Sequence, residues 1–171
     1  MIGSLHKQME VRMAGMKIFI SYSHEDDRWR KLLSEQLKIL ERECLVQLWD
    51  DQKLQAGEHW REHLYQELLD AQIAILMISP SFLTSDFIRD VEVATLFEKC
   101  EKEGDTVLYP LLIRPCPYEE VGWLAKRQMR PKGPRPRALS TLTGPKRDEV
   151  CVAVAREIAS IARAATARVQ R

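Results

Sequence analysis

The chain has 171 residues, of which 45% are hydrophobic and 30% are charged, so it can bury one ordinary core and leaves little for a second domain. Its 26 basic and 25 acidic residues nearly cancel, and this balance gives no electrostatic reason to expect a nucleic acid or a membrane surface as the partner. The longest apolar run, Ile73 to Ile78, is far shorter than a membrane span.

The N-terminal residues 1–15 mix charged and apolar side chains without the apolar stretch of a secretory signal. We therefore expect a flexible leader followed by one domain over residues 16–168. Scattered cysteines without a C-x-x-C pair are typical of reduced thiols, which predicts a cytoplasmic protein. The four cysteines are Cys44, Cys100, Cys116 and Cys151.

The first predicted strand covers Met16–Ser21 and runs into polar residues. Ser23 and Asp26 then stand three apart, which is the spacing of a helix N-cap and an acidic residue in the first turn. Apolar residues recur at helical spacing from Trp29 onward and predict an amphipathic helix to about Arg42.

A second strand is predicted over Cys44–Trp49, followed by a polar loop, Asp50–Gly57, and a helix, Glu58–Asp70. The third strand, Ile73–Ile78, is apolar at every position. This pattern indicates a strand that is covered by helices on both faces of the sheet.

In the C-terminal half, a helix over Ser85–Glu103 precedes a fourth strand, Thr106–Ile113. Pro110 lies inside that strand and lacks a backbone donor, so we expect a bulge there, or pairing that breaks on one side. Arg137–Thr141 can form a short fifth strand, and an apolar stripe predicts a last helix over Lys146–Arg168.

The repeated alternation of strands and helices predicts an α/β fold with a mostly parallel sheet and right-handed crossovers. At this length we expect a flavodoxin-like, doubly wound five-stranded sheet in the order 2-1-3-4-5, with helices on both faces. Ligands of such sheets bind at the carboxyl ends of the strands, beside strands one and three. This rule selects three segments: Ser21–His24, Asp50–Gly57 and Ser79–Glu92.

The same segments resemble the Toll/interleukin-1 receptor (TIR) domain family, especially its bacterial members. Ile18–Ser23 looks like the family's first-strand signature, and Trp49–Gly57 is similar to its BB loop. Ile78–Glu92 resembles the third strand and the start of the helix that carries the family's catalytic Glu. Leu111–Cys116 looks like the fourth-strand exit of bacterial members, and the resemblance covers roughly residues 16–165.

The resemblance implies a domain that associates with other TIR domains through Asp50–Gly57 and, in many members, cleaves NAD between nicotinamide and ribose. Glu92 occupies the position of the catalytic carboxylate. One enzymatic branch has a Trp four residues before that Glu, where this chain has Ile88. NAD is then the substrate, and the resemblance implies neither a further cofactor nor a metal. The expected substrate-binding residues are Ser21, Tyr22, Ser23, Asp50, Lys53, Gly57, Ser85 and Ile88.

The helical spacing around Glu92 supports a role for this residue. Ile88, Glu92 and Leu96 fall in one row, so the carboxylate lies between two apolar neighbours rather than on an evenly polar face. Because nicotinamide leaves NAD as a neutral molecule, it needs no proton from an acid. One carboxylate that orients the ribose and stabilises the developing positive charge can suffice. The alternative is that Glu92 is one surface Glu among several on this helix.

Several other classes of site fit the sequence less well. His59 and His63 stand four apart without an evident third metal ligand, which favours a solvated helix face. The basic stretch 130–137 lacks interleaved aromatics, so a nucleic-acid role is not expected. Neither glycine-rich phosphate-loop motif occurs. A phospho-acceptor receiver is excluded because the third strand ends in Ser79-Pro80 and not in Asp.

Two functions remain open at the level of sequence. The first is an NAD-cleaving effector of signalling or antiviral defence, switched on by self-association. The second is an adaptor that recruits other TIR domains without chemistry, which Ile88 in place of Trp favours. For either function we expect a sensing domain or partner subunit.

Overall fold

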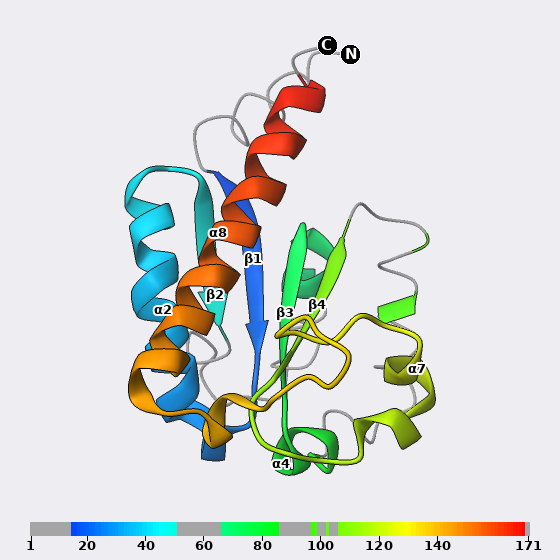
Figure 1. The fold of residues 1–171 in the computed structure, drawn as a ribbon. Helices are drawn as coiled ribbons and strands as arrows, with labels where there is room; N and C mark the ends of the chain where they lie inside the picture. Colours follow the sequence, from blue (N-terminus) through cyan, green and yellow to red (C-terminus); the bar gives the residue numbers. More distant parts are fainter. Residues whose placement is uncertain (1–14, 51–65, 86–96, 99–101, 103–105, 170–171) are drawn as a thin grey trace.

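The computed structural model describes residues 15–50, 66–85, 97–98, 102 and 106–169 (Figure 1). The strands are β1 (Met16–Ser21), β2 (Val46–Asp50), β3 (Ile73–Ile78) and β4 (Val107–Leu112). The helices are α2 (Asp27–Arg42), α4 (Pro80–Leu83), α7 (Gly122–Ala125) and α8 (Gly144–Val169), with 3-10 turns η1 (His24–Asp26), η3 (Tyr118–Glu120) and η4 (Leu139–Thr141).

The four described strands form one parallel sheet in the order β2-β1-β3-β4. This confirms the predicted fold class and the first four positions of the predicted order. Because the chain crosses from β2 past β1 to β3, the switch point of the sheet lies between β1 and β3. The carboxyl ends of these strands meet at the lower edge of the sheet in Figure 1, beside α4.

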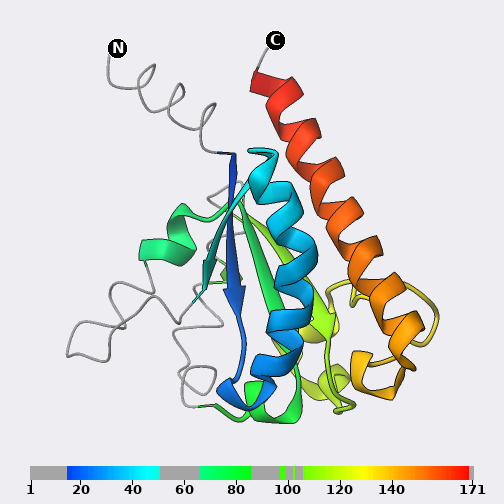
Figure 2. The same cartoon turned by 90° about the vertical axis from the view of Figure 1, so that its left-hand side faces the viewer.

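Apolar side chains cover both faces of the sheet. Along β3, alternate residues point to opposite sides, and every residue of the strand is buried. One side packs with α2 and α8, which lie side by side on that face (Figure 2), in a core that includes Ile18, Ile75, Leu33, Leu37, Val154 and Ile158. The opposite core includes Phe19, Leu76, Ile78, Phe82, Phe97 and Leu124. The prediction that the third strand is covered on both faces is confirmed.

The second strand begins later than predicted, at Val46 instead of Cys44. Cys44 has a φ of 56° and is exposed, so it forms part of the turn between α2 and β2. The left-handed conformation reverses the chain and is incompatible with a strand.

Pro110 does not produce a bulge, because the register between β3 and β4 runs without a break and places Leu76 opposite Pro110. The carbonyl oxygen of Pro110 accepts from the backbone N–H of Arg130, on the side away from β3. In a parallel strand the N–H and C=O of one residue point to the same side, so the missing N–H of Pro110 removes no bond to β3.

The prediction of a fifth strand over Arg137–Thr141 is wrong, because residues 139–141 form the turn η4. The outer side of β4 is instead paired by a single parallel bridge between Leu111 and Arg130. Prolines follow at positions 131, 134 and 136. They cannot donate to a ladder, so the segment cannot extend this bridge into a strand.

Helix α8 is the longest described helix, with 26 residues. Its buried residues form one stripe over the sheet, and charged and small side chains occupy the exposed surface. None of the helices in the described part of the chain combines the length and the apolar character that crossing a membrane requires.

Candidate functional site

Polar side chains from three separate parts of the chain meet at the carboxyl edge of the sheet. Asp26 follows β1, Ser79 follows β3, and Arg114 follows β4 by two residues. The side chain of Asp26 is completely buried. Its Oδ2 accepts from Ser79 Oγ at 2.5 Å, and its Oδ1 accepts from Arg114 Nε at 2.8 Å. The two partners compensate the cost of placing a carboxylate in the interior.

A second layer of contacts connects this buried group to the surface. Arg114 Nη2 donates to Ser81 Oγ at 2.5 Å, and Ser81 Oγ donates to Glu25 Oε2 at 2.6 Å. The Glu25 carboxylate also lies 3.8 Å from Arg114 Nη2. We call these five residues the edge network: Glu25, Asp26, Ser79, Ser81 and Arg114. The edge network joins the ends of β1, β3 and β4 into one polar unit.

Ser79 also determines where α4 begins. Its Oγ accepts from the backbone N–H of Phe82 at 3.0 Å, and Pro80 occupies the first turn of the helix. A serine N-cap followed by proline is a strong helix start. Because the same hydroxyl donates to Asp26, the start of α4 is fixed against the end of β1.

The prediction that the Ser23 side chain caps the first helix is wrong. Ser23 occupies the N-cap position of η1, but its side chain forms no capping hydrogen bond. Asp26 does lie in the first turn, as predicted, and there it is buried in the edge network. One indication of the edge network is present in the sequence: Asp26, Ser79 and Arg114 each follow the end of a predicted strand.

The expected binding residues that the structure describes lie at or near the same edge. Ser21 and Tyr22 are buried, and the Arg30 guanidinium lies 5.2 Å from the Tyr22 ring centre. Ser85 is half-buried and donates to the carbonyl oxygen of Phe82 at 2.7 Å. Asp50 is the last residue of β2. The predictions for Lys53, Gly57, Ile88 and Glu92, and for the histidine pair His59 and His63, lie outside the described residues.

The described residues contain no group of three or more His, Cys, Asp or Glu side chains that could hold a metal ion. The edge network itself offers two carboxylates, but an arginine lies between them at 2.8 Å and 3.8 Å. A bound cation would have to displace that guanidinium. The edge network is thus suited to fixing the positions of loops and to presenting polar groups at its exposed rim.

A second charged cluster attaches α8 to the sheet. Glu157 accepts from Tyr109 Oη at 2.9 Å and from Arg130 Nη2 at 2.8 Å, and Lys132 Nζ lies 2.8 Å from the same carboxylate. Burial alone would raise the pKa of Glu157, but the hydrogen bonds from Arg130, Lys132 and Tyr109 outweigh it and lower the pKa to about 2. Burial and the Glu157 carboxylate raise the pKa of Tyr109, so this phenol stays protonated and donates.

A parallel α/β sheet in the order β2-β1-β3-β4, with polar groups gathered at its switch point, defines a flavodoxin-like domain. The comparison with known families makes the assignment specific: the family model described as TIR domain matches residues 18–140. The chain therefore belongs to the TIR domain family.

One relative among curated proteins is uncharacterized protein y4lF of Sinorhizobium fredii (strain NBRC 101917 / NGR234). It is 30% identical to this chain over 101 residues. The matched stretch covers 59% of this chain and 31% of the relative, so the chain spans less than a third of the relative's length.

Proposed function

We propose that this TIR domain self-associates and hydrolyses NAD at the bond between nicotinamide and ribose, with Glu92 as the catalytic carboxylate. The products are nicotinamide and ADP-ribose or a cyclic form of it. In hydrolysis, water adds to the ribose carbon that nicotinamide leaves, and one proton is released. In the cyclic form, an atom of the ADP-ribose part of the same molecule bonds to that carbon in place of water. The membership of the family supports this proposal, and the edge network is the observation that carries it.

The edge network supports the proposal because it fixes the start of the segment that leads to Glu92. Ser79 and Ser81 bind Asp26 and Arg114, which follow two other strands. The chain from Ser79 to Ser85 is thereby fixed at the switch point, seven residues before Glu92. A carboxylate that must stand beside a ribose benefits from such a rigid base, because catalysis depends on positioning.

Cleavage of NAD at this bond requires mainly one correctly positioned carboxylate. The nicotinamide of NAD departs as a neutral molecule, so no general acid is needed. A carboxylate beside the ribose hydroxyls can orient the sugar and stabilise the positive charge that develops on its ring. Ser21, Tyr22, Ser23 and Ser85 are the residues that we propose to help hold the substrate, since they lie at or near the edge where such sheets bind ligands.

The alternative is a TIR adaptor that assembles through Asp50–Gly57 and performs no chemistry. Ile88 favours it, because one enzymatic branch of the family carries a Trp at that place. In either case we propose that a sensing domain or partner subunit controls assembly. The length of the relative supports this, because the match covers 31% of that protein.

Nicotinamide release from NAD separates the two functions. We expect release by concentrated protein, or by protein clustered through a fused oligomerisation tag, and its loss in Glu92→Gln with an unchanged circular dichroism spectrum. Glu98→Gln is the matched control, because Glu98 is an exposed Glu nearby in the sequence. If the clustered wild-type protein releases no nicotinamide, the adaptor function stands and the hydrolase function is wrong.

A further inference from the structure

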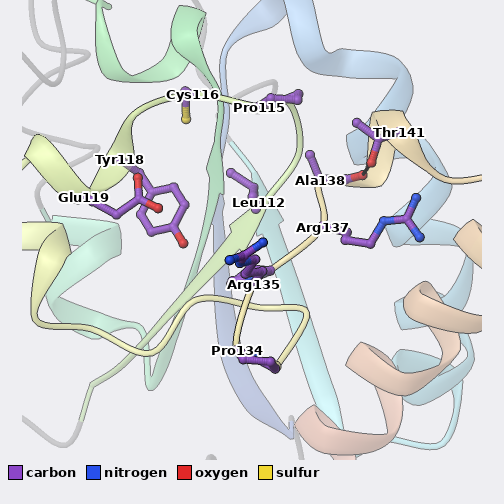
Figure 3. Close-up of a pocket in the computed structure, with 11 residues that line it drawn as sticks. Leu112, Pro115, Cys116, Tyr118, Glu119, Pro134, Arg135, Arg137, Ala138 and Thr141 are labelled. Carbon is purple, nitrogen blue, oxygen red and sulfur yellow. Dashed lines mark hydrogen bonds between the residues drawn. The ribbon is translucent and has the colours of Figure 1, made fainter.

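A cavity of about 360 Å³ opens between the segment that leaves β4 and the proline-rich segment before η4 (Figure 3). Leu112 and Ala138 line it and are almost fully buried. Figure 3 shows Tyr118 on one side of Leu112 and Arg137 on the other. The cavity shares no residue with the edge network.

The lining combines an apolar floor with flat walls. Pro115, Pro134 and Pro136 contribute rings around the buried side chains of Leu112 and Ala138. Cavities of a few hundred Å³ that combine apolar side chains with polar groups can hold small molecules. Such a surface suits the face of a planar, apolar molecule.

The charged groups of the lining favour an anion. Arg135 and Arg137 are exposed at the cavity, and within the described part of the chain neither side chain forms a hydrogen bond or an ion pair. Arg114 and Arg130, in contrast, are bound to carboxylates. The two guanidinium groups outnumber the one acidic side chain of the lining, Glu119. Guanidinium groups recognise phosphate and carboxylate through charged hydrogen bonds.

The remaining polar groups add no negative charge near neutral pH. Burial and the hydrogen bond to the neighbouring Glu119 carboxylate raise the pKa of Tyr118, so its hydroxyl stays protonated. Burial and Glu119 also raise the pKa of Cys116, so its thiol stays protonated. An anionic ligand would therefore meet two cations, against a single carboxylate that is exposed and can turn toward water.

We propose that this cavity binds a small organic anion, with a planar apolar body against Leu112 and the proline rings and a phosphate or carboxylate group toward Arg135 and Arg137. Phosphate and carboxylate share the chemistry that the two arginines recognise. The ligand's body supplies contact with the apolar floor, which an inorganic anion cannot do.

Binding can be tested by two-dimensional amide NMR of the full chain with phenyl phosphate, benzoate, benzyl alcohol and inorganic phosphate. We expect saturable shifts at the amides of Cys116 and Ala138 with one or both aromatic anions, and the stronger of the two identifies the acidic group. Benzyl alcohol tests the charge, and inorganic phosphate tests the apolar floor. Benzyl alcohol and inorganic phosphate should each bind at least about tenfold more weakly than the better aromatic anion. Absence of saturable shifts with both aromatic anions would overturn the proposal, as would equal binding of either control.

Substitution of the two arginines tests the assigned donors. Arg135→Gln/Arg137→Gln should weaken aromatic-anion binding by about tenfold or more, because it removes the charged hydrogen bonds. Arg163→Gln, on the distant C-terminal half of α8, is the matched control and should bind as the wild type does. Unchanged binding by the double variant would contradict the site. A change in its sedimentation without a change in anion binding would identify the cavity as a protein contact instead.

The thiol inside the cavity gives an independent readout. The bound anion should slow the alkylation of Cys116 by iodoacetamide. Peptide mass spectrometry measures the extent of alkylation over time. Alkylation of the exposed Cys44, which lies in the turn before β2, should continue at its original rate. Equal protection of both cysteines, or of neither, would argue against binding in the cavity.

Discussion

At the scale of single residues, the buried carboxylate of Asp26 depends on partners from distant parts of the chain. Its exposed fraction is 0%, and its two described hydrogen bonds come from Ser79 and Arg114. A buried charge that loses one partner keeps its desolvation cost without the matching attraction. The stability of the carboxyl edge should therefore respond strongly to either side of the Asp26–Arg114 pair.

We predict that Arg114→Gln lowers the free energy of unfolding by about 3 kcal/mol, because it leaves the Asp26 carboxylate buried without its cation. Urea unfolding at pH 7 measures the change. In the double variant Asp26→Asn/Arg114→Gln, the loss of stability should be smaller than the sum of the two single losses. The reason is that Asp26→Asn removes the carboxylate charge that Arg114→Gln leaves without a partner. Additive losses would mean that the two side chains are not coupled. Arg156→Gln, on the exposed face of α8, is the control.

The edge network shows why the site was only partly predictable. The rule for parallel sheets selects the strand ends, and Ser79 and Ser81 of the edge network lie in one of the three segments that it selects. The rule does not predict which side chains form hydrogen bonds with one another, however, because Asp26 lies 53 residues from Ser79 and 88 from Arg114 in the sequence. Local spacing predicted only that Asp26 lies in the first turn of a helix. A hydrogen bond between such distant residues depends on the completed fold, and no local periodicity encodes it.

At the scale of elements, apolar runs predicted β1, β3 and β4 well because strands that are buried on both faces require such runs. The errors occur where a backbone property outweighs the side-chain pattern. Cys44 belongs to an apolar segment, but its positive φ places it in a turn. Residues 137–141 continue a β-like pattern, but the preceding prolines leave only the bridge at Arg130. The periodicity of apolar residues does not show where the chain reverses or where proline removes a backbone N–H donor.

The start of β1 depends on a glycine. Gly15 has a φ of +76°, and a Cβ there would lie 2.7 Å from the backbone N of Val46 and 2.8 Å from the carbonyl oxygen of Cys44. We predict that Gly15→Ala destabilises the protein by about 2 kcal/mol, because backbone atoms at the start of β2 cannot move aside. Thermal unfolding measures this. Gly122→Ala should lose no stability, since a Cβ at Gly122 meets no atom within 4 Å. Equal effects of both changes would contradict the assigned clash.

The attachment of α8 should depend on pH through Glu157. The hydrogen bonds to this carboxylate lower its pKa from 4.5 to about 2, so between these values the unfolded state binds more protons than the folded state. The stabilisation is therefore present above about pH 4.5 and is lost as the pH falls toward 2. We predict that Glu157→Gln costs about 2 kcal/mol at pH 7 and progressively less below pH 4.5.

Urea unfolding of the wild type and Glu157→Gln across this pH range gives the comparison. Glu149→Gln is the control, because Glu149 is an exposed glutamate on the same helix. A stability difference between the wild type and Glu157→Gln that stays constant down to pH 2 would show that the effect comes from packing and not from the charge.

At the scale of the whole molecule, the family and the proposed chemistry both point to assembly. The chain has a net charge of +1, so long-range repulsion between copies is weak and contact surfaces can decide association. If the active arrangement requires contact between copies, a dilute monomer is inactive even when its fold is intact. Activity then depends on protein concentration through mass action.

We therefore predict that nicotinamide release per molecule rises with protein concentration and levels off once assembly is complete. Adding Glu92→Gln to dilute wild-type protein should raise the release per wild-type molecule, because the variant can supply a contact surface although it cannot catalyse. Sedimentation of the same mixtures should show assemblies over the same concentration range. Bovine serum albumin at equal mass is the control for crowding. A rate per molecule that is independent of concentration, and unaffected by the added variant, would show that each copy is active alone. Hydrolysis would then be retained as the function, and control by assembly would be withdrawn.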